Sequence, residues 1–444
     1  MMLDRPSVAS VPAPWRPSSG PSRVTEAPAG TLIARLMCGN LALRMAVTLS
    51  GQLFGFFAAT QLVSRTLSSA MVVSAVGGCF NIAALVTFPL AGGIADRRGH
   101  ARVLVWSPLI GAFACGVATL IALSHLRGAL GLSLLLIARA GEGVGAVCAV
   151  PSMFTLLARA TERDEAARTR VMGMFEITAL VGLSLGILCA GMAWERFRAH
   201  ALVALVPLYL VGAPLLAIRD IKATATPIAR MDSPSSLSQS MRALLDDPIR
   251  RAFIVAWIAL NAVVGALLQY LPYLLLIGAR SHSQRLVGSF SGAAATMVIA
   301  GVGALYVGGT SLWSFVGSRV PRTRMLWLSV TGVIGMSLSL AIVNHGGSRL
   351  WYIPFGLSVA IQGGMTPASM GLIGDLTAKN DRTRGAAMGL FSLLMGLGQM
   401  LGGLMCGPFV AHWRLDGLLL FDALLGVLAL AMMPWILRIA SPRR

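Results

Sequence analysis

Two residues of opposite charge, Arg139 and Glu142, stand three positions apart inside a long apolar run, residues 130–157. Residues three apart lie on one face of a helix, so the two side chains can reach each other. A charge in the middle of a bilayer costs ~2.5–3.5 kcal/mol even on insertion scales, so each needs a use or a partner. One interpretation is a structural ion pair. The other is a proton relay, in which Glu142 binds and releases a proton.

Two further charged residues lie within apolar runs. Glu176 is either a second membrane acid that takes part in proton coupling or an interfacial residue at the cytoplasmic end of its span. Arg44 either extends its long side chain to the inner interface, or anchors an anionic group of a substrate, or pairs with Glu142. The sequence leaves these alternatives open.

Neutral polar residues are spaced through the apolar runs that we expect to line a central cavity. A lone amide in a membrane span often makes only an interhelical hydrogen bond, which is the alternative reading. A lining of amides and apolar side chains suits a small amphipathic substrate. The candidate cavity residues are Gln52, Asn81, Asn261, Gln269, Tyr270, Gln362 and Gln399.

The chain shows little that would serve an enzyme. Its six histidines are scattered, its six cysteines form no CxxC pair, and it has no GxxxxGK[ST] nucleotide-binding motif. We therefore expect no catalytic residue, no metal and no cofactor. A membrane enzyme acting on lipid is a weaker alternative. So is a scaffold or sensor that transports nothing, because it would tolerate the loss of Arg139 and Glu142.

Composition places these residues in a membrane protein. The chain has 444 residues, of which 56% are hydrophobic and only 12% charged, whereas soluble domains carry about 25% charged residues. Twelve apolar runs have the roughly 20 residues that a membrane helix needs. They predict an all-α membrane protein with spans at 32–61, 70–94, 103–124, 130–157, 171–194, 200–218, 252–278, 287–315, 325–345, 350–375, 386–411 and 417–438.

The remaining segments divide the chain into two six-helix halves. We expect a disordered cytoplasmic tail at 1–30, halves at 31–218 and 251–438, a cytoplasmic linker at 219–250, and a short cytoplasmic tail at 439–444. With both termini in the cytoplasm, 26 of the 36 Lys and Arg residues fall on the inner side and 8 on the outer. This asymmetry favours that orientation. It also explains the net charge of +19 without nucleic-acid binding.

The two halves repeat each other in sequence. A shift of 216 residues brings Pro151 onto Pro367, Thr161 onto Thr377 and the Met172-Gly173 pair onto Met388-Gly389 without a gap. Several glycines of the fifth run coincide in the same way with glycines of the eleventh. Parallel repeats of six helices are one plan on which secondary transporters are built.

The link between the second and third runs carries a motif, Gly92-x-Ile94-Ala95-Asp96-Arg97-x-Gly99. It resembles the signature loop of the major facilitator superfamily, although His100 and Ala101 stand where that family usually has two basic residues. Arg139 with Gly143-x-Gly145 resembles a second motif of the family. Together with the repeat, these motifs imply twelve membrane helices in two parallel-repeat halves.

The resemblance also implies a function. The fifth run, with Gly182, Gly186 and Gly191, is similar to the antiporter motif of the family, although Ile187 and Ala190 depart from it. The chain is most like the twelve-helix, proton-coupled drug and siderophore exporters. This implies a monomeric efflux transporter in the cytoplasmic (inner) membrane, working with a small molecule and protons. Uptake by proton symport is the alternative.

The signature loop further implies a conformational gate formed by Gly92, Asp96, Arg97 and Gly99. A carboxylate is stabilised at a helix N-terminus by free backbone N–H groups and the positive dipole end. We therefore expect Asp96 to meet the first turn of the eleventh span, near Gly385, when the transporter faces outward. The alternative is that Asp96 only pairs with a neighbouring arginine and orients the loop.

Overall fold

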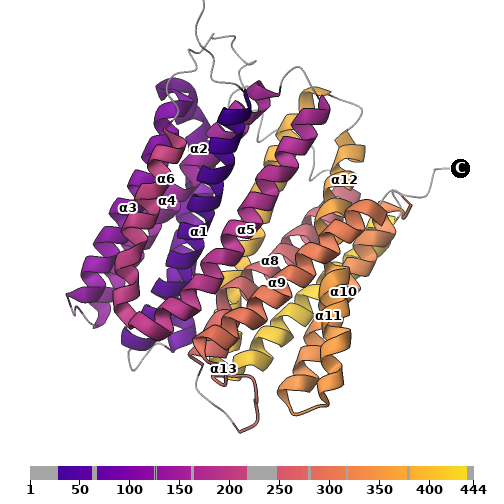
Figure 1. Cartoon of the computed structure of the whole chain (residues 1–444). Helices are drawn as coiled ribbons and strands as arrows, with labels where there is room; N and C mark the ends of the chain where they lie inside the picture. The colour runs from indigo at the N-terminus through magenta and orange to yellow at the C-terminus, as the bar shows by residue number, and fades with distance from the viewer. Residues whose placement is uncertain are drawn as a thin grey trace, which may run out of the picture.

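The computed structural model describes residues 29–62, 68–124, 126, 128–161, 165–217, 248–278, 282–316, 319–377 and 381–437. The regular secondary structure of this part of the chain is helical, and it contains no strand. Figure 1 shows long helices packed side by side in two groups, one formed by the N-terminal half and the other by the C-terminal half. The expected tails and most of the expected linker lie outside the described residues.

The N-terminal half contains six helices. Ser68 caps the start of the second by accepting a hydrogen bond from Met71 N–H at 3.3 Å. Gly99, with φ 92°, separates the second helix from the third, so the second extends beyond its expected end. The helices are α1 (Ala29–Gln61), α2 (Ser69–Arg98), α3 (His100–Leu123), α4 (Gly128–Ala160), α5 (Glu165–Phe197) and α6 (Leu205–Leu216), with a 3₁₀ segment η1 (Arg198–Ala204) before α6.

The C-terminal half departs from the expected pattern at its fourth span. The single helix expected over 350–375 is broken at Gly363 and Gly364, where a side chain on Gly363 would strike the backbone of the adjacent helix near Tyr306 and Thr310. The elements are α8 (Pro248–Leu276), α9 (Gly292–Val316), α10 (Arg322–Asn344), η2 (Arg349–Trp351), α11 (Tyr352–Gln362), α12 (Met365–Thr377) and α13 (Asp381–Leu437).

The longest helix, α13, folds back on itself at Arg414, the one residue inside it with non-helical backbone angles. Phe409 and Phe421 would be ~18 Å apart along a straight helix, yet their ring centroids are 5.4 Å apart. Arg198, between α5 and α6, also has a positive φ, 49° against 54° for Arg414. The two residues are 216 positions apart, so the sequence repeat extends to this turn.

Nine helices in the described part of the chain are long and apolar enough to cross a membrane. This is fewer than the twelve expected, for two reasons. Two of the nine stretches, Arg170–Leu216 and Leu393–Leu437, each contain one of the arginine turns. In addition, α11 and α12 are each too short to be counted alone.

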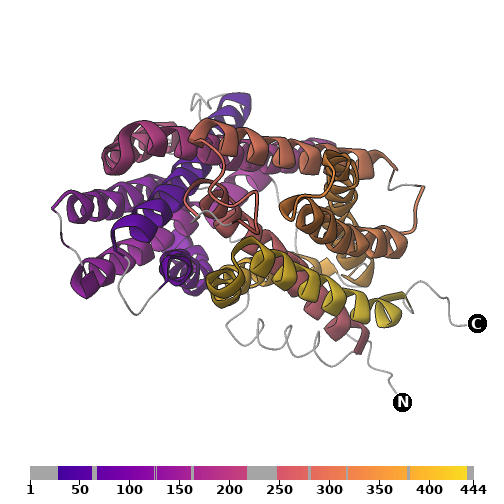
Figure 2. The same cartoon turned by 90° about the horizontal axis from the view of Figure 1, so that it is seen from below.

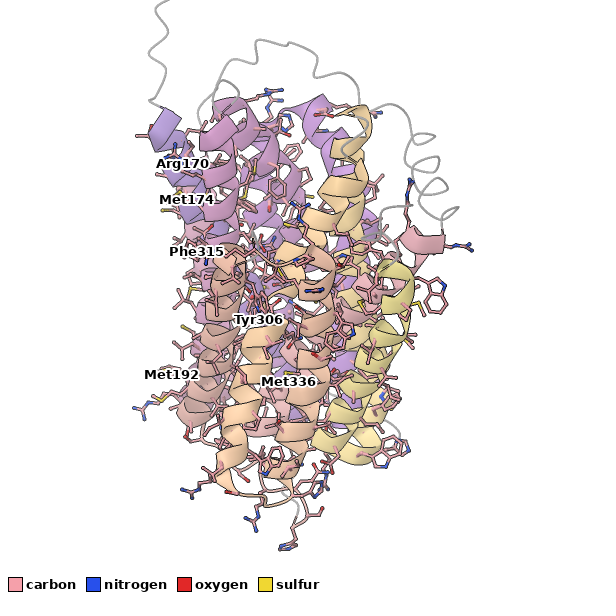
Figure 3. All side chains as sticks on the ribbon, turned by 90° about the vertical axis from the view of Figure 1, so that its right-hand side faces the viewer. Arg170, Met174, Met192, Tyr306, Phe315 and Met336 are labelled. Carbon is pink, nitrogen blue, oxygen red and sulfur yellow. The ribbon has the colours of Figure 1, made fainter. Side chains whose placement is uncertain are left out.

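The two halves meet along two pairs of helices, α5 with α9 and α2 with α13 (Figure 2). Figure 3 shows Arg170 and Met174 towards one end of α5 and Met192 towards the other, so this helix extends through much of the molecule. A side chain added at Gly191 would lie 3.0 Å from the carbonyl oxygen of Gly292. Small residues therefore allow the halves to approach closely.

Within the described residues, the polar contacts between the halves lie at one end of the bundle. Gln52 donates to the Leu268 carbonyl at 2.9 Å, and Ser74 donates to the Leu404 carbonyl at 3.0 Å. Glu195 accepts from the backbone N–H of Ala293, in the first turn of α9, at 3.2 Å. These residues lie towards the ends of α1, α5 and α8 and the starts of α2 and α9, which share one side of a membrane bundle. The halves are closed on that side.

Within the C-terminal half, α8 and the first part of α13 pack with almost no side chain between them. A side chain at Gly398 would lie 2.6 Å from the carbonyl oxygen of Ile258, and one at Gly402 would overlap the Ala262 carbonyl. Backbone cannot move aside as a flexible side chain can. These glycines therefore fix the distance between the two helices.

We predict that Gly402→Val lowers the melting temperature of the purified transporter, because overpacking of a close contact costs ~1–3 kcal/mol. The matched control is Gly301→Val in α9, where an added Cβ meets no atom within 4 Å. Both variants place a β-branched residue inside a helix, so their difference isolates the packing term. Equal melting temperatures for the two variants would contradict this account.

Candidate functional site

The charged pair on α4 is buried and in contact. Arg139 is 3% exposed and Glu142 1% exposed, and the guanidinium donates from Nη1 to Glu142 Oε2. The i, i+3 spacing brings the two side chains to one face of the helix, as the sequence indicates. In the apolar interior each charge is therefore neutralised by a residue of its own helix.

Two residues that the sequence did not single out complete this network. Ser50 on α1 donates its hydroxyl to Glu142 Oε1, and it accepts from Arg139 Nη1 at 3.0 Å. Tyr209 on α6 donates to the same Glu142 oxygen at 2.5 Å. Glu142 thus receives donors from three helices. The available signal was weak: a tyrosine inside an apolar span of a chain with five tyrosines.

Arg139 makes further contacts beyond the carboxylate. Its guanidinium carbon lies 4.6 Å from the ring centroid of Phe80 and 5.8 Å from that of Phe54, within the range of cation–π attraction. Its Nε atom is buried and has no hydrogen-bond partner. An unpaired buried donor is costly. Aromatic faces therefore stabilise a cation whose hydrogen bonds are only partly satisfied.

Arg139 also reaches a cavity between the two halves. The cavity has a volume of ≈160 Å³ and is bounded by α1, α2, α4, α5, α8 and α13. Apolar groups such as Phe56, Phe80 and Ile187 form much of its wall. Its polar lining consists of Thr48, Gln52, Asn81, Arg139, Gln269, Tyr273 and Gln399.

Four of the amide residues expected to line a cavity therefore lie here: Gln52, Asn81, Gln269 and Gln399. Two of them also join the halves. Gln52 donates to Leu268, as described above, and Gln269 donates to the Val73 carbonyl at 3.0 Å. The cavity wall and the interface between the halves are thus built from the same side chains.

The other three expected residues lie elsewhere. Asn261 donates to the Trp257 carbonyl of its own helix at 2.9 Å, and Tyr270 donates to the Gly403 carbonyl at 2.8 Å. Gln362 is 2% exposed at the end of α11. None of the three lines the cavity between the halves. Buried polar groups find partners wherever a backbone carbonyl is near, and the sequence does not reveal which carbonyl that is.

Arg44 and Glu176 lie apart from the Glu142 network, on α1 and α5. A side chain at Gly182 would lie 2.9 Å from Arg44 Cβ, so the two helices are close here. Glu176 is exposed, and its charge acts on Arg44 and on Tyr306 of α9. Within the described residues, no ion pair under 4.0 Å involves either side chain.

The glycine-rich stretch of α5 also matches a GxSxG pattern, Gly182-Leu183-Ser184-Leu185-Gly186. In serine hydrolases this pattern forms a sharp turn between a strand and a helix. Here it lies inside α5, where Gly182 and Gly186 allow close packing against the backbone of α1. Its setting is that of a packing motif.

The expected gate residues lie at the α2–α3 junction. Asp96 is 74% exposed and lies 3.5 Å from His100 Nε2. Arg97 is exposed, and Gly99 provides the left-handed turn. A side chain at Gly92 would meet no atom within 4 Å, so no close approach occurs there in this conformation. The side chains of residues 381–392, which include the expected partner of Asp96, lie outside the described part of the chain.

Solved structures of transporters share this fold. A mutant of the nucleoside transporter NupG matches with a TM-score of 0.73 and 16% identity, over 91% of this chain and 99% of that one. The D-xylose-proton symporter gives 0.66 and 16%, over 91% and 96%. An inward-facing bacterial homolog of the lysosomal transporter Spinster gives 0.63 and 15%, over 94% and 96%. At these identities the likeness concerns the fold alone.

A search of curated proteins found no match. The sequence model of the Major Facilitator Superfamily matches residues 41–377, well over half of the chain. The proteins of this family carry small molecules across membranes and are not enzymes. The chain therefore belongs to the major facilitator superfamily of membrane transporters.

Proposed function

We propose that this chain is a proton-coupled secondary transporter of a small amphipathic molecule, working by alternating access in the cytoplasmic membrane. One observation carries the proposal: Arg139 pairs with Glu142 and at the same time lines the cavity between the halves. A purely structural ion pair could be packed away from any cavity. This one lies where the Glu142 carboxylate and a substrate can compete for the same guanidinium.

The coupling follows from that competition. An ionised Glu142 holds Arg139 in the buried network. A proton on Glu142 removes its negative charge and weakens its hold on the guanidinium, which can then bind an acceptor or anionic group in the cavity. Because linkage is reciprocal, a substrate that binds Arg139 also favours protonation of Glu142.

The cavity supports a small substrate with both apolar and hydrogen-bonding parts. Its volume of ≈160 Å³ is below the roughly 300–1,000 Å³ of pockets for drug-sized ligands. Larger cargo would require the cavity to widen. The antiporter-like glycines favour efflux, yet one structural neighbour is a proton symporter, and uptake has equal support. Accumulation or exclusion of substrate in energised cells decides the direction.

The proposed topology has twelve spans. It counts each side of the turns at Arg198 and Arg414 separately, and α11 with α12 as one span. The halves are residues 31–218 and 251–438, with both termini in the cytoplasm, as the arginine distribution favours. In this orientation the closed side of the bundle is the outer one, and the conformation faces the cytoplasm.

A gate at Asp96 has support from helix register. Ser74 contacts Leu404, and Leu85 lies 3.8 Å from where a Cβ on Gly396 would be, so α2 and α13 run antiparallel. Asp96 lies eleven residues after Leu85 on α2, and Gly385 lies eleven residues before Gly396 on α13. The antiparallel register therefore brings Asp96 level with Gly385. Glu195 makes the corresponding contact on the other side, at the first turn of α9.

We predict that Glu142→Gln abolishes substrate transport driven by a pH gradient, because glutamine cannot release a proton. Substrate exchange without a gradient survives. Both are measured in proteoliposomes. Asp416→Asn is the control, since it removes an acid of the C-terminal half that lies outside this network.

A second variant controls for loss of stability. Removing one partner of a buried ion pair leaves Arg139 without its counterion, which destabilises the fold by about 3–5 kcal/mol. Glu142→Gln combined with Arg139→Gln removes both charges. Coupling remains lost in this double variant if Glu142 carries the proton. Recovery of gradient-driven transport would instead assign the pair a structural role only.

We predict opposite shifts from the two proposed gates. Asp96→Asn removes a carboxylate–helix contact worth about 1–2 kcal/mol, which shifts the population roughly 5- to 30-fold towards the inward-facing state. Glu195→Gln shifts it the other way. The measurement is the labelling rate of a single-cysteine reporter at the cytoplasmic mouth of the cavity, with Asp96→Glu as the charge-retaining control. Unchanged labelling in Asp96→Asn would mean that Asp96 only orients its loop.

Arg44 is proposed as an anchor for an anionic group of the substrate. Arg44→Ala then weakens substrate binding well beyond any loss of expression. Arg44→Lys restores part of it, because lysine keeps the charge but loses the planar fork. Binding is measured on purified protein by calorimetry. Normal affinity in Arg44→Ala would show that the side chain only extends to the interface.

A further inference from the structure

A third membrane-embedded acid, Asp422, lies on α13 after the turn at Arg414. It is 0% exposed, and both of its carboxylate oxygens are buried without a hydrogen-bond partner. Nothing in its sequence spacing suggests a partner, because no basic residue lies within the following fifteen positions. Its setting contrasts with that of Glu142, which has a guanidinium and two hydroxyl groups in contact.

The surroundings of Asp422 are defined by the reversal of α13. The turn packs the end of the helix against its first part, and this brings Asp422 within electrostatic range of the buried Cys406 thiol. One turn further on, a Cβ at Gly426 would lie 2.9 Å from Ile334 of α10. Cys406 is thus one titratable neighbour of Asp422. The arginines of α10, Arg322 and Arg324, stand at the start of that helix.

A nearby aspartate, Asp416, has the hydrogen-bond donors that a carboxylate accepts from. Asp416 receives hydrogen bonds from Asn344 at 2.9 Å and Gln284 at 2.8 Å, and it contacts His345 at 3.0 Å. Asp422 has no such donor. An isolated carboxylate in an apolar interior is far more costly than the neutral acid. A neutral acid also carries its own donor, which can bond to a backbone carbonyl of the helix.

We propose that Asp422 is a second proton-binding site of this transporter, occupied by a proton in the conformation described. A single buried carboxylate without a hydrogen-bond partner suits a proton as its ligand. This inference rests on the proposed proton coupling and adds to it a carrier in the C-terminal half. The site also lies against the helix that contributes Gln399 to the cavity.

Infrared difference spectroscopy of the full-length transporter tests the protonation state directly. The spectrum of the wild type minus that of Asp422→Asn, at pH 7.5, contains the C=O stretching band of a neutral carboxylic acid. The corresponding difference for Asp416→Asn contains carboxylate bands instead. Carboxylate bands in the Asp422 difference would overturn the proposal. The measurement needs no transport, so it stands independently of the result for Glu142→Gln.

A transport measurement tests the role in coupling. Asparagine is permanently neutral, so Asp422→Asn lowers the number of protons moved per substrate molecule in proteoliposomes, whereas Asp416→Asn keeps the wild-type ratio. Melting temperatures of both variants establish that each is folded. An unchanged ratio in folded Asp422→Asn would overturn the role of this site in the transport cycle. If Glu142→Gln retains coupling while Asp422→Asn loses it, the proton path runs through the C-terminal half alone.

Discussion

A charge inside an apolar bilayer must be neutralised close by, and this constraint organises the centre of the molecule. Arg139 and Glu142 satisfy it within one helix, at a spacing that places them on the same face. Ser50 and Tyr209 then bring α1 and α6 to the carboxylate. The N-terminal half is thus tied together at its middle by one polar cluster. The cavity begins where that cluster ends, at the guanidinium.

The contact between the halves has a different character. It includes close glycine approaches, such as that of Gly191 with Gly292, and a few hydrogen bonds from amide and hydroxyl side chains to backbone carbonyls. Such contacts are individually weak and can be exchanged for others when the halves rock. Because Gln52 and Gln269 serve both in the interface and in the cavity wall, movement of the halves changes the substrate site directly. If the interface were rigid, movement of the halves could not change the substrate site in this way.

The sequence predicted the parts of the structure that depend on short spacing or on repetition. The contact between Arg139 and Glu142 is local, and the 216-residue repeat is visible by alignment alone. The partners Ser50 and Tyr209 lie 92 and 67 residues from Glu142, and no spacing rule reaches that far. Spacing also does not reveal which backbone carbonyl a polar side chain will meet. The sequence suggested Asn261 and Tyr270 as cavity residues, and in the structure each donates to a nearby backbone carbonyl.

The break at Gly363 was also invisible in the sequence. The chain reversals near Arg198 and Arg414 fall between predicted spans, but the sequence did not show that an arginine with positive φ makes each turn. A glycine pair is consistent with a continuous helix, and an arginine gives no signal of a left-handed backbone. Only contact with neighbouring helices selects these conformations. The close approach to α9 selects the first, and the packing of Phe409 against Phe421 accompanies the turn at Arg414.

The turn at Arg414 bears on how the protein is made. The two arms of α13 are joined by one non-helical residue, so almost no polar loop separates them. A ribosome-bound chain that releases its helices into the bilayer one at a time would leave the first arm without the partner that covers it. The two arms are therefore suited to enter the lipid together, as a preformed helical hairpin. Biogenesis of the C-terminal end would then be a single insertion event.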